Sequence, residues 1–136
     1  MDDGAMLVRT EKMPQIPQRP MAVRVRTPIG SAAVLWRGDA QEADGHHLVE
    51  WTIDDDIYWG QNTHPAPCAE PGIRQDGGRL VLRGRLQLTE DGAAYLQMGY
   101  WPVLFDLASP IPDSADGAWV EISVEAGSVA LYPYQT

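Results

Sequence analysis

Hydrophobic and polar residues alternate along two neighbouring runs between Arg79 and Trp101, and this pattern predicts a pair of antiparallel strands. Alternation of period two puts one set of side chains in a core and the other on an outer sheet face. Across Glu90-Asp91-Gly92, a three-residue loop pairs Leu88 with Ala94, whereas a two-residue loop would mix the two faces. The three-residue loop is therefore predicted, with two further inward pairs, Leu86 with Leu96 and Leu82 with Tyr100.

The outer face of this hairpin is predicted to carry polar and aromatic side chains. Gly84 falls opposite Met98, and a glycine within a strand often marks a bend or bulge. Pro102 ends regular pairing or restricts it to an edge. The outward residues are Arg83, Arg85, Gln87, Tyr95, Gln97 and Trp101.

Shorter alternating runs predict strands on both sides of the hairpin. Near the N-terminus, a three-residue loop ending at Gly30 would pair Val25 with Ala33 and Val23 with Leu35. Residues 47–53 form a further expected strand, with the inward residues Val49, Trp51 and Ile53.

A last hairpin is expected across Ala126-Gly127, with outward residues that include Trp119, Glu121 and Ser123. Helical periodicity is absent from every window of 11 or more residues. The pattern therefore predicts an all-β protein, a single antiparallel β-barrel or sandwich of about seven to eight strands built from hairpins, with little or no helix. The inward residues of the last hairpin would be Val120, Ile122, Val124, Val129 and Leu131.

The chain divides into an arm and one domain. Pro14, Pro17 and Pro20 recur at every third residue, and proline removes backbone donors and favours extended backbone. Residues 1–20 are therefore expected to form a proline-rich extended arm, and residues 21–136 a single antiparallel β domain.

Charge and cysteine content narrow the class of protein. A net charge of −9, from 19 acidic and 10 basic residues, argues against a surface that tracks a nucleic-acid backbone throughout. The single cysteine, Cys68, excludes a fold stapled by intramolecular disulfides. No signal-like segment or membrane-length apolar run is present, so a cytoplasmic protein without a membrane partner is expected.

No motif predicts catalysis or a cofactor. His46 and His47 are adjacent and would point to opposite faces of a strand, and the segment from His64 to Cys68 contains two prolines. Cys68 has no helix start nearby to activate it, and Asp106 is expected to cap a turn. We therefore expect no metal and no cofactor, and favour a noncatalytic protein while leaving an enzyme open.

Aromatic composition favours recognition. Five tryptophans and five tyrosines accompany one phenylalanine, and such rings are enriched at interfaces and pockets. The first hypothesis is a binding module that recognises a protein partner, or itself as a homodimer, through an outer sheet face. The residues predicted to carry this role are Arg83, Arg85, Tyr95, Gln97 and Trp101.

Two alternatives remain open. The first is a small-ligand barrel protein or enzyme whose interior or mouth would be lined by Trp51, Tyr58, Trp59, Tyr100 and His47. The second, ranked lower, is single-stranded nucleic-acid binding, for which the five-stranded oligonucleotide-binding barrel is the general architecture. The expected strand count already exceeds five, and the net charge opposes this second alternative.

Overall fold

The computed structural model describes residues 6–99 and 101–134, which form eleven strands and three single-turn 3-10 helices. The fold is all-β, as the alternation predicts. The short helices are η1 (Ala40–Glu42), η2 (Asp113–Ala115) and η3 (Ala126–Ser128). The strands are β1 (Met6–Lys12), β2 (Ala22–Thr27), β3 (Gly30–Trp36), β4 (Gly45–Ile53), β5 (Thr63–Pro65), β6 (Gly72–Asp76), β7 (Arg79–Leu88), β8 (Ala94–Met98), β9 (Trp101–Phe105), β10 (Trp119–Glu125) and β11 (Val129–Pro133).

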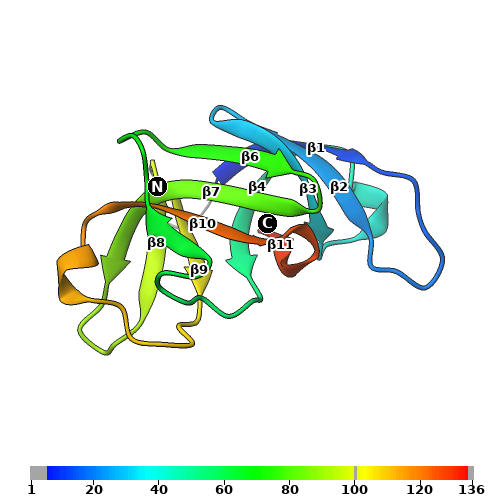
Figure 1. The fold of residues 1–136 in the computed structure, drawn as a ribbon. Helices are drawn as coiled ribbons and strands as arrows, with labels where there is room; N and C mark the ends of the chain where they lie inside the picture. The colour runs from blue at the N-terminus through cyan, green and yellow to red at the C-terminus, as the bar shows by residue number, and fades with distance from the viewer. Residues whose placement is uncertain (1–5, 100, 135–136) are drawn as a thin grey trace.

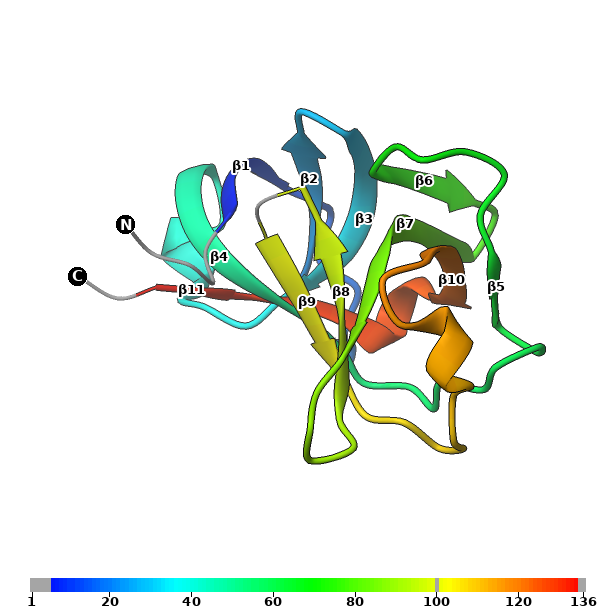
Figure 2. The same ribbon diagram turned by 90° about the vertical axis from the view of Figure 1, so that its left-hand side faces the viewer.

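The strands form one sheet that closes on itself (Figures 1 and 2). Hydrogen-bonded neighbours follow the order β1-β2-β3-β6-β7-β8-β9-β4 and return from β4 to β1, which makes an eight-stranded closed barrel. The strands β10 and β5 extend the sheet from the other edge of β7, and β11 lies between β3 and β4. A barrel, one of the two architectures predicted, is confirmed, and its eight strands agree with the expected number. Three further strands bring the total in the described chain to eleven, and the sheet is mixed, because β3 pairs in parallel with β6 and β11, and β4 with β9.

The last strand, β11, divides this barrel into two rings. Because β11 runs parallel to β3 and antiparallel to β4, the strands β1-β2-β3-β11-β4 close a five-stranded ring. This is the strand order of the oligonucleotide-binding type of barrel, here with residues 54–128 inserted before the final strand. The inserted segment rejoins the ring where β6 pairs with β3 and β9 with β4.

The central hairpin, β7–β8, has the predicted register. Leu88 pairs with Ala94, and Leu86 with Leu96. The backbone N–H of Thr89 donates to the carbonyl of Ala93 at 2.9 Å, which leaves the predicted three-residue loop. The expected pair of Leu82 with Tyr100 lies outside the described residues.

Gly84 marks a change of neighbour in β7. Pairing between β7 and β10 continues through Gly84, so a bulge, one of the two features expected there, is absent from this pairing. Before this residue the other edge of β7 is paired with β6, and after it with β8. A Cβ added at Gly84 would lie 2.6 Å from the carbonyl oxygen of Gln97, so close approach of the backbones explains this glycine.

The loop of this hairpin makes a pH-dependent contribution to stability. Three hydrogen bonds lower the pKa of the Asp91 carboxyl below its ordinary value of 3.8. The largest effect comes from the hydroxyl of Thr89, and smaller effects come from the backbone N–H groups of Ala93 and Asp91. Because the pKa is lowered in the folded state, this stabilisation is present above the ordinary value and is lost as the pH falls through the lowered one. We expect Asp91→Asn to unfold at a lower temperature than the wild type at about pH 7, and the difference to be smaller at about pH 3. Thermal unfolding at both pH values checks this, and a difference independent of pH would contradict it.

Part of the segment that was expected to form an arm, Met6–Lys12, is a strand of the barrel and contributes to its core. β1 pairs with β2 on one edge and with β4 on the other, and it buries Met6, Val8 and Thr10. The hydroxyl of Thr10 donates to the carbonyl of Ala43 at 2.6 Å. The expected arm is therefore wrong for Met6–Lys12, because the prolines that suggested it begin only at Pro14, after the strand has ended.

The hairpin β2–β3 differs by one residue from its expected register. Val25 pairs with Ala32 and Val23 with Val34, so the loop has two residues and not three. The hydroxyl of Thr27 accepts from the backbone N–H of Ile29 at 3.1 Å and fixes this shorter turn.

The glycine that suggested the longer loop serves another purpose. Gly30 begins β3 with φ +144° and pairs with Ile73 of β6. An added Cβ would lie 1.9 Å from the carbonyl oxygen of Ile73. Close contact between two strands, together with the positive φ, requires this glycine.

The expected last hairpin does not form. β10 pairs with β7 and β5, while β11 pairs with β3 and β4, because the turn η3 redirects the chain between them. The inward residues are nevertheless buried as predicted, since alternation reports a buried face but not its neighbour. They join a single hydrophobic core that runs through both rings, and its largest fully buried side chains include Trp51, Met6, Ile57, Leu80, Leu82 and Leu96.

Candidate functional site

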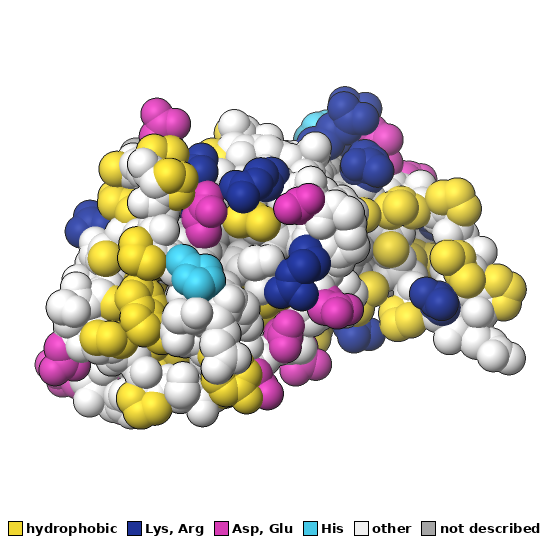
Figure 3. Space-filling model, in the orientation of Figure 1, with side chains coloured by type: hydrophobic (Ala, Val, Ile, Leu, Met, Phe, Trp, Pro, Cys, Tyr) yellow, Lys and Arg dark blue, Asp and Glu magenta, His cyan; other side chains and the backbone are white. Residues whose placement is uncertain are grey.

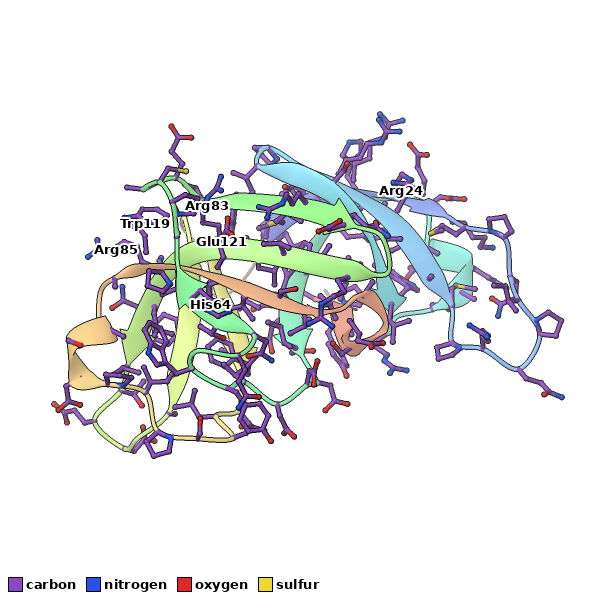
Figure 4. The ribbon with its side chains drawn as sticks, in the orientation of Figure 1. Arg24, His64, Arg83, Arg85, Trp119 and Glu121 are labelled. Atoms are coloured by element: carbon purple, nitrogen blue, oxygen red, sulfur yellow. The ribbon has the colours of Figure 1, made fainter. Side chains whose placement is uncertain are left out.

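One outer sheet face gathers all four arginines of the inserted segment. β7 lies at its centre, with β10 along one edge and β6 and then β8 along the other. Residues directly opposite one another on antiparallel strands point to the same side, so the pairing defines the members of this face. We call it the arginine face (Figure 4): His64, Arg74, Asp76, Arg79, Arg83, Arg85, Tyr95, Gln97, Trp119, Glu121, Ser123 and Glu125.

Glu121 joins two arginines at the centre of the arginine face. Its Oε2 accepts a hydrogen bond from Arg83 Nη1 at 3.0 Å and another from Arg74 Nη1 at 3.1 Å. The side chains of Arg83 and Glu121 are each 20% exposed, so solvent screens this pair less than an open surface pair. Arg83 Nε also donates to the carbonyl oxygen of Glu70 at 2.8 Å. One carboxylate thus meets two arginines, and the centre keeps a net positive charge.

The other two arginines are held by polar groups of β10 and the segment before it. Arg79 donates through Nη2 to the carbonyl oxygen of Ser123 at 2.7 Å and through Nε to its hydroxyl at 2.9 Å. Arg85 Nε donates to the carbonyl oxygen of Gly117 at 3.1 Å. A guanidinium has five N–H donors, so these bonds orient both side chains and leave donors for a partner.

Half-buried aromatic rings lie beside the arginines. Trp119 is directly opposite Arg85, which is in turn opposite Gln97 of β8 (Figure 4). Tyr95 lies on the same side one step further along β8. The face therefore combines fixed cations with rings that can contribute apolar contact area.

Four of the five predicted partner-binding residues are brought together on this face: Arg83, Arg85, Tyr95 and Gln97. Trp119 and Glu121 were expected on an outer face, but nothing in the sequence placed them beside Arg85 and Arg83. The pairing of β10 with β7 joins segments more than thirty residues apart, and alternation alone cannot report it.

Trp101 does not belong to the arginine face. The chain turns at Gly99, with φ +70°, and Trp101 opens β9 opposite the buried Met98. It is half-buried against the hydrophobic core, on the same side as Val103. The expectation that Trp101 faces outward was wrong, because it treated residues 94–101 as one uninterrupted strand.

The residues of the alternative ligand pocket are dispersed. Trp51 is 1% exposed within the core, Trp59 packs against the core from the segment after β4, and Tyr58 is half-buried. His47 lies at another end of the barrel, where its ring is 5.0 Å from that of Trp36. Tyr100 lies outside the described residues. His47 lines a surface hollow together with His46, Leu48 and Tyr134, and Trp51 is not among the residues that line it.

The other candidate reactive groups remain separate or exposed. Asp106 lies beside Asp54, Asp55 and Asp56 in an open hollow, without the apolar surroundings that a catalytic acid needs. Cys68 is exposed, and His64 Nε2 is 2.9 Å from the carbonyl oxygen of Gln61. Among the described residues, no group of three or more histidine, cysteine, aspartate or glutamate side chains is arranged to hold a metal ion.

No protein family, no curated protein and no solved structure matches this chain. No helix in the described part of the chain is long and apolar enough to cross a membrane.

Proposed function

We propose that the protein is a noncatalytic binding module that recognises an acidic surface of a protein partner through the arginine face. The observation that carries this proposal is the collection of four arginines on one sheet face of a chain whose net charge is −9. Arginine, tryptophan and tyrosine are the residues most enriched among those that dominate binding energy at protein interfaces. A symmetric dimer that pairs two arginine faces is less suitable, because each face carries four arginines against three carboxylates and would oppose its own excess of positive charge.

The arginine side chains are already ordered by hydrogen bonds within the protein, and this favours binding. Free arginine side chains lose rotamer entropy when they bind, at a cost of about 0.5–1.5 kcal/mol each. Arg83, Arg79 and Arg85 are already held by hydrogen bonds to β10 and the segments beside the sheet, so less of that entropy remains to be lost. Electrostatic attraction to carboxylates would accelerate association and set its dependence on salt.

The five-stranded ring is not proposed as a nucleic-acid site, even though it has an oligonucleotide-binding strand order. Strand order does not determine function, which depends on the chemistry of a site. In barrels of this type, ligands occupy the face of the second and third strands. The outward residues of β2 and β3 here include no aromatic ring on which a base could stack: Ala22, Arg24, Arg26, Ser31, Ala33 and Leu35. We also propose a cytoplasmic location, where the exposed Cys68 would remain reduced.

Charge reversal on the arginine face tests the proposal. The double variant Arg79→Glu/Arg85→Glu replaces two exposed arginines, which donate hydrogen bonds to the backbone of Ser123 and Gly117. In affinity capture from nuclease-treated extract of the source cells, we expect one partner to be retained by the wild type and lost by this variant. The captured complex should weaken by roughly tenfold between low salt and about 0.3 M salt.

A matched control separates this surface from net charge. Arg19→Glu/Arg37→Glu changes the total charge equally at exposed positions outside the arginine face, and it should retain the partner. Unchanged thermal unfolding of both variants would show that they are folded. Retention of the partner by Arg79→Glu/Arg85→Glu would refute the proposed site.

A further inference from the structure

We propose that the partner-binding surface continues from the arginine face across β6 and β3 onto the barrel strands β2 and β1, and that one extended acidic segment of the partner occupies its whole width. This inference rests on the function proposed above. It is carried by a second group of cations, which we call the barrel cluster: Arg9, Arg24 and Arg26.

The barrel cluster carries more positive charge than its surroundings neutralise. Arg9 lies directly opposite Arg26 of β2 on one side and His46 of β4 on the other. The like charges of Arg9 and Arg26 are destabilising, whereas Arg24 lies directly opposite Glu11. Glu11 is 3.4 Å from Arg26 Nε and 4.0 Å from Arg9 Nη2, but these side chains are 43–59% exposed, so the ion pairs add little stability. An excess of cations without a structural role points to an external anion.

The barrel cluster and the arginine face belong to one continuous surface. β6 joins β3 through the pair Gly30 and Ile73, and the side chain of Gln75 accepts from the backbone N–H of Ala33 at 2.9 Å. The outward residues of β3 nearest this junction, Ser31 and Ala33, are uncharged, so no carboxylate of β3 separates the two groups. In Figure 3, dark-blue side chains recur from the left of the centre to the upper right, and Figure 4 shows Arg24 and Arg83 on the same upper side.

Charge is strongly divided between this surface and the rest of the molecule. The outward residues of β1, β2, β6, β7 and β10 include seven arginines and four carboxylates, a net charge of +3. Since the chain as a whole carries −9, the remainder carries −12. A flexible acidic segment would be attracted to this surface and repelled from the rest of the molecule.

The sheet geometry sets the length of the segment. Measured along the curved sheet from β10 through β7, β6, β3 and β2 to β1, five steps between neighbouring strands amount to about 24 Å at roughly 4.8 Å per step. An extended chain advances about 3.3 Å per residue, so roughly seven or more residues are needed to reach both cation groups.

Two fluorescein-labelled oligoglutamate probes, of about four and about twelve residues, test this extension by fluorescence anisotropy. Three double variants alter the net charge equally: Arg24→Glu/Arg26→Glu, Arg79→Glu/Arg85→Glu and the control Arg19→Glu/Arg37→Glu. For the long probe, reversal of either cation group should raise Kd about tenfold, and the control should change it less than about twofold. For the short probe, reversal of the barrel cluster should change Kd less than about twofold, because the arginine face still binds it.

The outcomes distinguish this extension from the function on which it rests. If only Arg79→Glu/Arg85→Glu weakens the long probe, the extension is overturned and the proposed function stands. If neither reversal weakens it more than the control, both are overturned. Tighter binding of an oligothymidylate of equal length than of the long probe would also overturn both, in favour of a nucleic-acid partner. If the wild type binds neither probe, the extension fails, and the capture experiment above still decides the proposed function.

Discussion

Replacing Gly30 by alanine is expected to lower the free energy of unfolding by about 2–4 kcal/mol. The added Cβ would lie 1.9 Å from the carbonyl oxygen of Ile73, so β3 and β6 would have to separate. The backbone of Gly30, with φ +144°, is also strained for any residue that carries a side chain. Because this pair links β6 to β3, the barrel would lose its closure on that side. Denaturant unfolding followed by tryptophan fluorescence measures the change.

Gly127→Ala is the matched control for this substitution. An added Cβ at Gly127 meets no atom within 4 Å, and its φ lies outside the left-handed region, so its effect should stay within about 0.5 kcal/mol. Equal stability of the Gly30 and Gly127 variants would contradict the close contact between β3 and β6.

Val8→Asp is expected to have the largest effect of any substitution considered, a loss of more than about 4 kcal/mol. Val8 is 2% exposed in β1, and a carboxylate there would be buried without a partner. The adjacent Leu7 is 57% exposed on the other side of the same strand, so Leu7→Asp should cost less than about 1 kcal/mol. Far-ultraviolet circular dichroism and thermal unfolding compare the two variants. If residues 1–20 were an arm, both substitutions would be tolerated, and that result would contradict the assignment of β1 to the core.

Local alternation was sufficient to predict the class of fold and one register. Burial of the leucines of β7 requires the three-residue loop Glu90-Asp91-Gly92, because a shift of the register by one residue would expose every leucine. Val49, Trp51 and Ile53 are buried as expected for the same reason. These successes concern contacts between residues close together in the chain.

The failures concern partners that are distant in the chain or glycines with more than one possible role. Nothing near Val120 or Val129 indicates that β10 joins β7 while β11 enters between β3 and β4. Gly30 is as compatible with a turn as with a close strand contact, and the sequence contains no feature that separates these two interpretations. The strand β1 was not predicted, because the prolines that follow it led to the interpretation of the whole segment as an arm.

In the candidate site, too, the sequence predicts neighbours that are close together in the chain and does not predict those that are far apart. Arg83, Arg85, Tyr95 and Gln97 follow from the register of one hairpin and are found together. The carboxylate of Glu121, which orients Arg83, comes from a strand 38 positions later in the sequence. Only long-range pairing could have revealed that the arginines are already ordered by neighbouring groups.

The position of β11 also has a consequence for how the molecule folds. Its pairs with β3 and β4 connect residues 76 to 95 positions apart, and they close the five-stranded ring. During synthesis on a ribosome, β1 to β4 would emerge long before β11, with the edges of β3 and β4 still unpaired. Closing such a long loop is entropically costly, so assembly should belong to the slow range of milliseconds to seconds typical of non-local β topologies. Until β11 pairs with β3 and β4, the nascent chain exposes two strand edges, and its risk of aggregation is greatest.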